Sequence, residues 1–253
     1  DQHNIRIISV EKNGSTAFAV YGYMNRGAHE GEVGVDIYYY DIEKNVVQEK
    51  AFIPSTKSFA IAEEELGKMV YYNQDQNLSY ILAGGKFYKI DLTKDEQTVL
   101  AKNLEEGQYT VSADGHLIAY QTSGTINTAQ EIKVLNLKTD EENAVAAKSG
   151  EAIRPLGFIG SDFVYGYLRQ GDVGHTAAGG ELFPMYELEI RNSENEVMKT
   201  YSADQIYISD VFIEENMMTL NRVVKSGETY TVTSQDYISS NEEKKTKSIT
   251  LEA

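Results

Sequence analysis

The chain has 253 residues, and its 39 acidic and 23 basic side chains give a formal net charge of −16. This charge repels a phosphate backbone and an anionic lipid surface, so nucleic-acid partners and direct membrane binding are disfavoured. Hydrophobic residues make up 41% and charged residues 25% of the chain, which indicates a folded globular core.

Apolar residues fall in short β-branched and aromatic runs between turn residues, which is the pattern of strands. In chain order the main runs are 5–10, 16–24, 35–40, 69–73, 78–83, 86–92, 117–121, 132–137, 163–168, 185–190, 207–213, 217–224 and 229–233. The best helix candidate, 60–68, is short and dominated by glutamates. Gly84-Gly85 and Asp114-Gly115 each predict a tight hairpin turn. We therefore expect an all-β fold.

A strand that ends in a polar turn recurs along the chain. Its anchor residues are separated by 50, 45, 53 and 47 positions, and they are Asp41, Asp91, Asn136, Glu189 and Asp236. A second match, between 21–27 and 165–171, has an offset of 144, which is three periods of 48. A period of this length with about four strands per unit is typical of a β-propeller.

The period predicts a single β-propeller domain, 1–253, with about five four-stranded antiparallel blades, either complete or part of a larger propeller. The expected repeats are 5–57, 58–107, 108–157, 158–205 and 206–253. A β-sandwich or a barrel is the competing architecture. Neither requires a fixed repeat, so the period favours the propeller.

One repeat carries a family resemblance. The segment 112–120 reads Ser-Ala-Asp-Gly-His-Leu-Ile-Ala-Tyr, and 131–139 reads Glu-Ile-Lys-Val-Leu-Asn-Leu-Lys-Thr. Together they resemble the repeat of TolB-like, or more broadly WD-like, β-propellers, with an Asp-Gly turn before the second strand. On the stretches 21–31, 155–167 and 183–186, the whole chain also resembles the extracytoplasmic propeller portion of uncharacterised, membrane-anchored proteins of Gram-positive bacteria. That second resemblance implies no known activity and no catalytic residues.

The chain contains no cysteine, which excludes disulfides, thiolate metal sites and cysteine nucleophiles. Because many exported bacterial proteins lack cysteine, we expect a secreted or membrane-anchored extracytoplasmic protein. The polar start, Asp1-Gln2-His3-Asn4, contains no signal peptide, as in a mature ectodomain. No apolar window is long enough to span a bilayer, so any membrane attachment is expected through an N-terminal anchor outside this sequence.

Two glycine-rich loops, 25–34 and 169–180, occupy matching places in the repeat. Binding residues favour loops on a rigid scaffold, so these loops are candidates for the rim that meets a protein or small ligand. The candidate residues are Tyr23, Arg26, His29, Glu30, Tyr167, Arg169, Asp172 and His175. The alternative is that both loops are solvated hairpins whose glycines serve only turn geometry.

Most chemical motifs are absent from the sequence. There is no nucleophile elbow, no P-loop and no dinucleotide fingerprint. Val33 occupies the position where a zinc-protease motif beginning at His29 needs its second histidine. In the calcium-like stretch that starts at Asn73, Leu78 occupies the place of the required glycine. We therefore predict no cofactor, no catalytic residue and no metal site.

The sequence leaves three interpretations of function open. The first is a non-catalytic binding scaffold whose biochemical role is unknown. The second is a five-bladed-propeller glycoside hydrolase, or a carbohydrate-binding protein, using axial carboxylates such as Asp36, Asp162 and Asp210. The third is a sensory ectodomain joined to a membrane segment. Consecutive tyrosines at 38–40 need no binding role, because both faces of a blade are buried.

Overall fold

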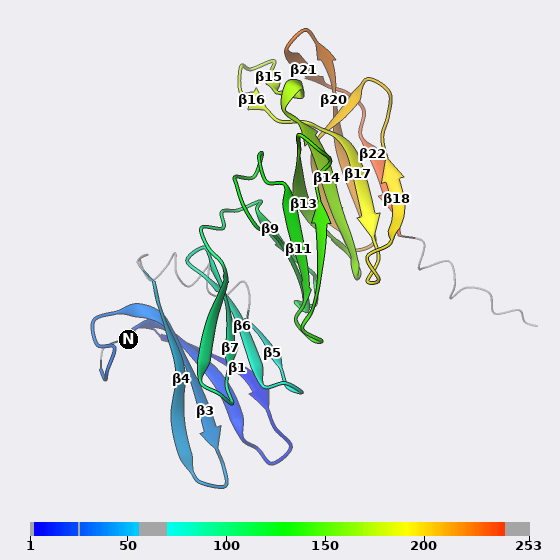
Figure 1. Ribbon diagram of the computed structural model, residues 1–253. Helices are drawn as coiled ribbons and strands as arrows, with labels where there is room; N and C mark the ends of the chain where they lie inside the picture. The colour runs from blue at the N-terminus through cyan, green and yellow to red at the C-terminus, as the bar shows by residue number, and fades with distance from the viewer. Residues whose placement is uncertain (1–2, 25, 56–69, 241–253) are drawn as a thin grey trace, which may run out of the picture. The chain divides into compact units, whose positions relative to one another are not determined.

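A computed structural model describes residues 3–24, 26–55 and 70–240 (Figure 1). These residues form 22 strands and one 3₁₀ turn, η1 (Gln170–Asp172), with no α-helix among them. Within these ranges, no helix has the length and apolar character needed to cross a membrane. The predicted all-β fold is confirmed. The helix candidate at 60–68 lies outside the described residues.

The first three sheets each contain four strands in sequential order. Their strands are β1 (His3–Val10), β2 (Thr16–Tyr23), β3 (Val33–Asp41), β4 (Val46–Ser55), β5 (Val70–Asn73), β6 (Leu78–Ala83), β7 (Lys86–Asp91), β8 (Glu96–Ala101), β9 (Tyr109–Val111), β10 (Leu117–Gln121), β11 (Glu131–Asn136) and β12 (Glu141–Ala146). Neighbouring strands in the first two sheets pair antiparallel. Each sheet is an up-and-down meander, the form of a propeller blade.

The later strands form one ten-stranded sheet. They are β13 (Glu151–Ile159), β14 (Asp162–Arg169), β15 (Gly174–Thr176), β16 (Glu181–Leu182), β17 (Met185–Arg191), β18 (Val197–Tyr201), β19 (Ile206–Glu214), β20 (Met217–Ser226), β21 (Thr229–Val232) and β22 (Asp236–Ser239). Along the main path the order is β13-β14-β17-β19-β20-β21-β15-β16. The propeller-type architecture is therefore seen as separate four-stranded blades only in the first three sheets. The blade count of five is not confirmed, and the repeat boundaries stay a prediction.

The chain divides into two compact units: unit 1 contains 1–105 and 136–141, and unit 2 contains 106–135 and 142–253. In unit 1, one buried cluster joins the first two sheets through residues such as Ile37 and Ile81. In unit 2, a second cluster joins the third sheet to β13 and β14 through residues such as Ile132 and Tyr165. Adjacent sheets thus bury each other's faces, as expected for stacked blades.

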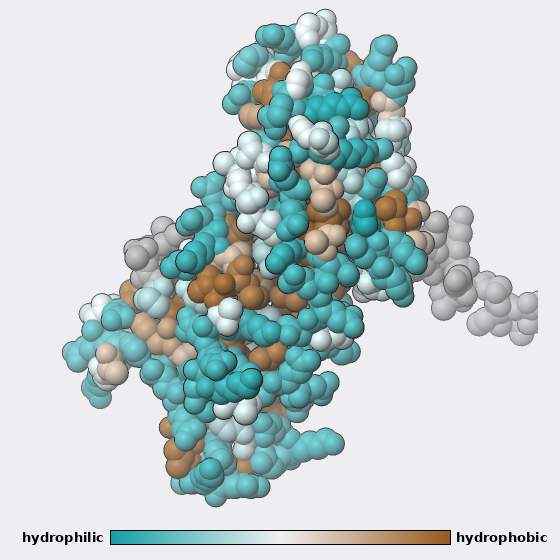
Figure 2. Space-filling model, viewed as in Figure 1, coloured by the Kyte–Doolittle hydropathy of each residue, from teal (hydrophilic) through white to brown (hydrophobic). Residues whose placement is uncertain are grey.

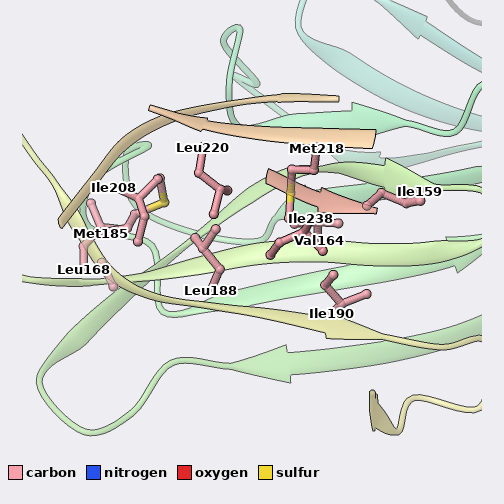
Figure 3. Close-up of a cluster of buried hydrophobic side chains, with 11 residues drawn as sticks. Ile159, Val164, Leu168, Met185, Leu188, Ile190, Ile208, Met218, Leu220 and Ile238 are labelled. Carbon is pink, nitrogen blue, oxygen red and sulfur yellow. The ribbon is translucent and has the colours of Figure 1, made fainter. Parts of the chain in front are cut away.

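The ten-stranded sheet curls around a core of its own. Figure 3 shows aliphatic side chains from several strands pointing toward one another, among them Val164, Leu188 and Leu220. Fully burying one such side chain contributes about 1.5–3 kcal/mol, so this cluster stabilises the curl. Outside the cores, the face seen in Figure 2 is mostly hydrophilic, in keeping with the charged composition.

The repeated polar turn has one structure in the first three sheets. Asp41, Asp91 and Asn136 each end the third strand of their sheet. In each case the side-chain Oδ1 accepts hydrogen bonds of 3.0–3.2 Å from the backbone N–H groups two and three residues later. This is an Asx turn, which explains why Asp or Asn occupies these three anchor positions.

Both predicted glycine turns close hairpins, in different ways. Gly84 and Gly85 alone connect β6 to β7, with φ of +57° and +74°. Such angles are accessible to glycine at little cost, as a two-residue hairpin requires. The loop around Asp114 and Gly115 is longer, from residue 112 to 116, and Ser112 Oγ accepts a 3.0 Å hydrogen bond from Leu117 N.

Candidate functional site

The two glycine-rich loops follow strands β2 and β14. The first, residues 24–32, connects β2 to β3 in unit 1. Its base is closed by a 2.7 Å hydrogen bond from Met24 N to Glu32 O. The second, residues 170–184, connects β14 to β17 in unit 2 and contains η1, β15 and β16.

Among the candidate residues of the first loop, His29 alone makes specific side-chain contacts in the part of the chain that the structure describes. Tyr23, Arg26 and Glu30 are exposed. The His29 ring stacks on Phe52, with 3.8 Å between ring centroids and 13° between planes. Its Nε2 lies 2.9 Å from Glu49 Oε1. The stacking and this hydrogen bond fix the imidazole over one face of the first sheet.

An irregularity in β4 determines which side chains share that face. Asp36 of β3 pairs with Phe52, whereas Tyr38, two residues along β3, pairs with Glu49. The register therefore shifts by one residue between these pairs, which is a β-bulge. In a regular strand, residues 49 and 52 would point to opposite faces. The bulge brings Glu49 to the face that carries Asp36 and the ring of Phe52.

Asp36 is the most unusual group of the first sheet, because a carboxylate is rarely buried without a cationic partner. Its residue is only 2% exposed. Tyr38 donates a 2.6 Å hydrogen bond to Asp36 Oδ2, but Oδ1 is buried and has no hydrogen-bond partner. Next to it stands a second carboxylate, Glu49. One ligand atom from each of His29, Asp36 and Glu49 lies within 4.8 Å of the other two.

The charges of this cluster perturb one another. Burial raises the pKa of Asp36 to about 6, the hydrogen bond from Tyr38 opposes the rise, and Glu49 adds to it. The hydrogen bond to Glu49 raises the pKa of His29. An imidazole and two carboxylates in this arrangement can share protons or coordinate a divalent cation. No other cluster of at least three such ligands occurs among the described residues.

The second loop places its candidate residues differently. Tyr167, expected at the rim, is only 4% exposed, and its hydroxyl donates a 3.1 Å hydrogen bond to Glu189 Oε2. This Tyr belongs to the core between the third sheet and β14. The Tyr167 side chain is therefore packed in the core and is not exposed on a rim, so its predicted binding role stays a prediction. Asp172 lies half-buried in η1, where its backbone carbonyl accepts a 2.5 Å hydrogen bond from the Tyr230 hydroxyl.

His175 helps to hold the second loop in place through its backbone. Its side chain is exposed, while its N–H donates a 2.8 Å hydrogen bond to Glu228 O. This bond belongs to a parallel pairing of β15 with β21, in which His175 faces Thr229. The second loop is therefore held as part of the ten-stranded sheet.

Arg169 lines a cleft of about 630 Å³ in unit 2. The residues around it are Lys148, Glu151, Arg169, Tyr186, Glu187 and 202–207. The Arg169 guanidinium lies 3.7 Å from the centroid of the Tyr186 ring, and its Nε is 3.6 Å from Glu151 Oε1. The Tyr186 hydroxyl donates a 2.5 Å hydrogen bond to Glu151 Oε2. Burial, followed by this hydrogen bond, raises the pKa of Tyr186 to about 12.

The two cations of the cleft are more exposed than their partners. Side-chain exposure is 53% for Arg169 against 16% for Glu151, and 48% for Lys148 against 17% for Glu187. Lys148 Nζ donates a 2.5 Å hydrogen bond to Glu187 Oε2. The entrance therefore presents cations to solvent and keeps their carboxylate partners beneath, while Asp204 adds one exposed carboxylate to the lining.

The three acids considered for glycoside hydrolysis lie in different surroundings. Asp36 is buried in unit 1, whereas Asp162 is half-buried and Asp210 is exposed in unit 2. Asp36 has Glu49 as its neighbouring carboxylate, and the sequence did not single out Glu49. Tyr186 and Glu151, which position Arg169, were also missed. Nothing in a sequence marks a bulge or a ring that stacks on a guanidinium.

No protein-family model and no curated protein matches the chain. Among solved structures, it is similar to Porphyromonas gingivalis dipeptidyl peptidase 4, with 9% identity, a TM-score of 0.31, and coverage of 89% of this chain and 45% of the peptidase. Oligogalacturonate lyase from Vibrio parahaemolyticus has 10% identity and a TM-score of 0.37, and the match covers 91% of this chain and 68% of the lyase. The β-propeller domain of the Trilobed protease from Pyrococcus furiosus has 9% identity and a TM-score of 0.35, and the match covers 91% of this chain and 71% of that domain. Similarity at this level does not indicate a shared activity.

Proposed function

We propose that this protein is a non-catalytic binding scaffold of the β-propeller type, and that the Arg169 cleft receives a peptide segment of a partner protein. The observation that carries the proposal is the exposure of Arg169 and Lys148 above carboxylates that are shielded from solvent. In a chain with a net charge of −16, a cleft entrance with two exposed cations stands out.

The chemistry of the cleft suits a peptide with an acidic side chain. The acidic group meets Arg169 and Lys148, which are exposed although each is paired with a carboxylate beneath it. The face of Tyr186 offers a flat apolar contact, since aromatic rings are favoured anchors at interfaces. Asp204 supplies an acceptor for backbone or side-chain amides of the same peptide.

A panel of short acidic, neutral and basic peptides tests the proposal. Binding to the full chain is measured by fluorescence polarisation, and mass spectrometry shows whether each peptide is recovered intact. We expect acidic peptides to bind best and to lose most of their affinity in Arg169→Ala. Arg26→Ala, an exposed arginine of the first loop, is the matched control and retains binding. Absence of binding by every peptide, or equal binding to Arg169→Ala, contradicts the proposal.

We also propose an extracytoplasmic location in a bacterium and a distant relation to TolB-like propellers. The support is the cysteine-free composition and, for the relation, the turns at Asp114 and Asn136. Fractionation of the source cells, followed by immunodetection of the chain, tests the location. Recovery in the cytosolic fraction contradicts it.

A further inference from the structure

The cluster of His29, Asp36 and Glu49 goes beyond the peptide cleft, because it lies in unit 1 and carries different chemistry. Its three side chains come from separate segments: the loop after β2, strand β3, and strand β4 at the bulge. Two of the segments are strands of one sheet, the inner strand β3 and the edge strand β4, and strands hold side chains more rigidly than a loop does. Stacking on Phe52 fixes the His29 ring.

Asp36 Oδ1 requires an explanation. It is buried, has no hydrogen-bond partner, and belongs to a residue that is 98% removed from solvent (2% exposed). The nearby hydroxyl of Tyr38 is directed to the other carboxylate oxygen, at 2.6 Å. A buried acceptor that is left without a hydrogen bond destabilises the fold, and more so if it is charged. A second carboxylate beside it increases the need for a positive charge.

We propose that His29, Asp36 and Glu49 form a binding site for a divalent transition-metal ion of the Zn²⁺ class. One imidazole nitrogen and two carboxylate oxygens are ligands that Zn²⁺ accepts. The two carboxylates match the charge of a divalent ion, and imidazole favours a transition metal over Ca²⁺ or Mg²⁺.

The three ligand atoms lie close together, all within 4.8 Å of one another. His29 Nε2 and Glu49 Oε1 are 2.9 Å apart. Two ligands bound to one tetrahedral zinc at about 2.0–2.1 Å lie roughly 3.3 Å apart, so these atoms have to separate by roughly 0.4 Å. Three protein ligands leave the fourth tetrahedral position for water or for a group from a partner. Both His29 and Glu49 are partly exposed, which gives the ion a path from solvent.

Calorimetric titration of the metal-free full chain with ZnCl₂ at neutral pH tests the proposal. We expect one Zn²⁺ per chain and a rise in the thermal unfolding midpoint with ZnCl₂. His29→Gln, Asp36→Asn and Glu49→Gln each remove one ligand and are expected to weaken binding by about tenfold or more. Glu49 is partly exposed, so Glu49→Gln keeps the test valid even if Asp36→Asn folds poorly.

His116→Gln is the matched control, because His116 also has a carboxylate partner, Asp114, and lies on an exposed turn. Its removal is expected to leave the titration unchanged. The same experiment with CaCl₂ is expected to give no heat. Absence of Zn²⁺ binding by the wild type overturns the proposal, in which case the three groups only share protons. Binding that persists in Glu49→Gln and is lost in His116→Gln also overturns it.

Discussion

Lys89 Nζ donates a 2.6 Å hydrogen bond to Asp140 Oδ2, connecting β7 to the turn between β11 and β12. The same carboxylate accepts a 2.6 Å hydrogen bond from the Tyr80 hydroxyl through Oδ1. All three residues belong to unit 1. This half-buried carboxylate is therefore satisfied on both oxygens, and its charge contributes to the stability of the unit.

Asp140→Asn is expected to lower the free energy of unfolding by about 1–3 kcal/mol at neutral pH, because it weakens two charge-assisted hydrogen bonds. Burial raises the pKa of Asp140, but the hydrogen bonds from Lys89 and Tyr80 outweigh it and hold the pKa below its usual value. A lowered carboxyl pKa stabilises the fold above the unfolded-state pKa of about 3.9, and the effect is lost as pH falls through the folded-state value. Urea titrations of the wild type and of Asp140→Asn, at neutral and at acidic pH, measure the difference in their free energies of unfolding.

Asp95→Asn is the control for this prediction. Asp95 occupies the corresponding position of the preceding turn, with φ of +55° against +61° for Asp140. Its ion pair with Lys50, at 3.3 Å, is on the surface, where such pairs contribute about 0–1 kcal/mol. A loss of stability in Asp140→Asn that stays equal at all pH values contradicts the electrostatic explanation.

Gly166→Ala is expected to destabilise the chain by about 1–3 kcal/mol through overpacking. A Cβ at Gly166 would lie 2.3 Å from Met185 Sδ and 2.9 Å from Leu188 Cδ2, both in the core of the ten-stranded sheet. Thermal unfolding followed by circular dichroism measures the effect. Gly171→Ala is the control, since its Cβ would meet nothing within 4 Å. Equal midpoints for the two variants would count against a packing role for Gly166.

Tyr165→Phe is expected to lower the free energy of unfolding by about 1–3 kcal/mol, because it breaks a buried network of hydrogen bonds. The Tyr165 hydroxyl donates to Glu189 Oε2 and accepts a 2.6 Å hydrogen bond from Arg191 Nε. Tyr237→Phe, whose ring is exposed, is expected to have little effect. Guanidinium titrations of both variants separate the two cases, and an unchanged midpoint in Tyr165→Phe refutes the prediction.

Tyr38→Phe tests how the proposed metal ligands are positioned. Without the Tyr38 hydroxyl, Asp36 Oδ2 loses the 2.6 Å hydrogen bond from it, and the carboxylate is less well oriented. Loss of such a supporting hydrogen bond typically weakens metal binding by about tenfold. Calorimetry with ZnCl₂ is the measurement, and Tyr40→Phe is the control, since its hydroxyl bonds to Asn45 on the surface. Equal affinities in both variants would show that Tyr38 has no positioning role.

The repeat could be predicted where a local hydrogen bond requires a residue type. At positions 41, 91 and 136, an Asp or Asn side chain holds the turn, so the sequence repeats with the structure. The match is weaker at Glu189, which lies inside β17. The turn that follows is held instead by Asn192, whose Oδ1 accepts hydrogen bonds from Glu194 N and Glu196 N.

The candidate site could be predicted only in part. His29 and Asp36 stand out by residue type, but Glu49 reaches them through a bulge, which depends on the pairing of two strands rather than on any motif. Tyr167 and Tyr23 occupy matching sequence positions, yet one is buried and the other 47% exposed. Burial depends on what packs against a strand, and the sequence of that strand does not contain this information.

The parallel pairing of β15 with β21 has a consequence for folding. It joins the segment after β14 to a strand formed much later in the chain. Closing a contact between such distant positions is slow, because most of the intervening chain must first be ordered. During synthesis, the loop 170–184, which contains Asp172 and His175, therefore cannot make this pairing until the β20–β21 hairpin has been synthesised. The loop reaches its final structure late.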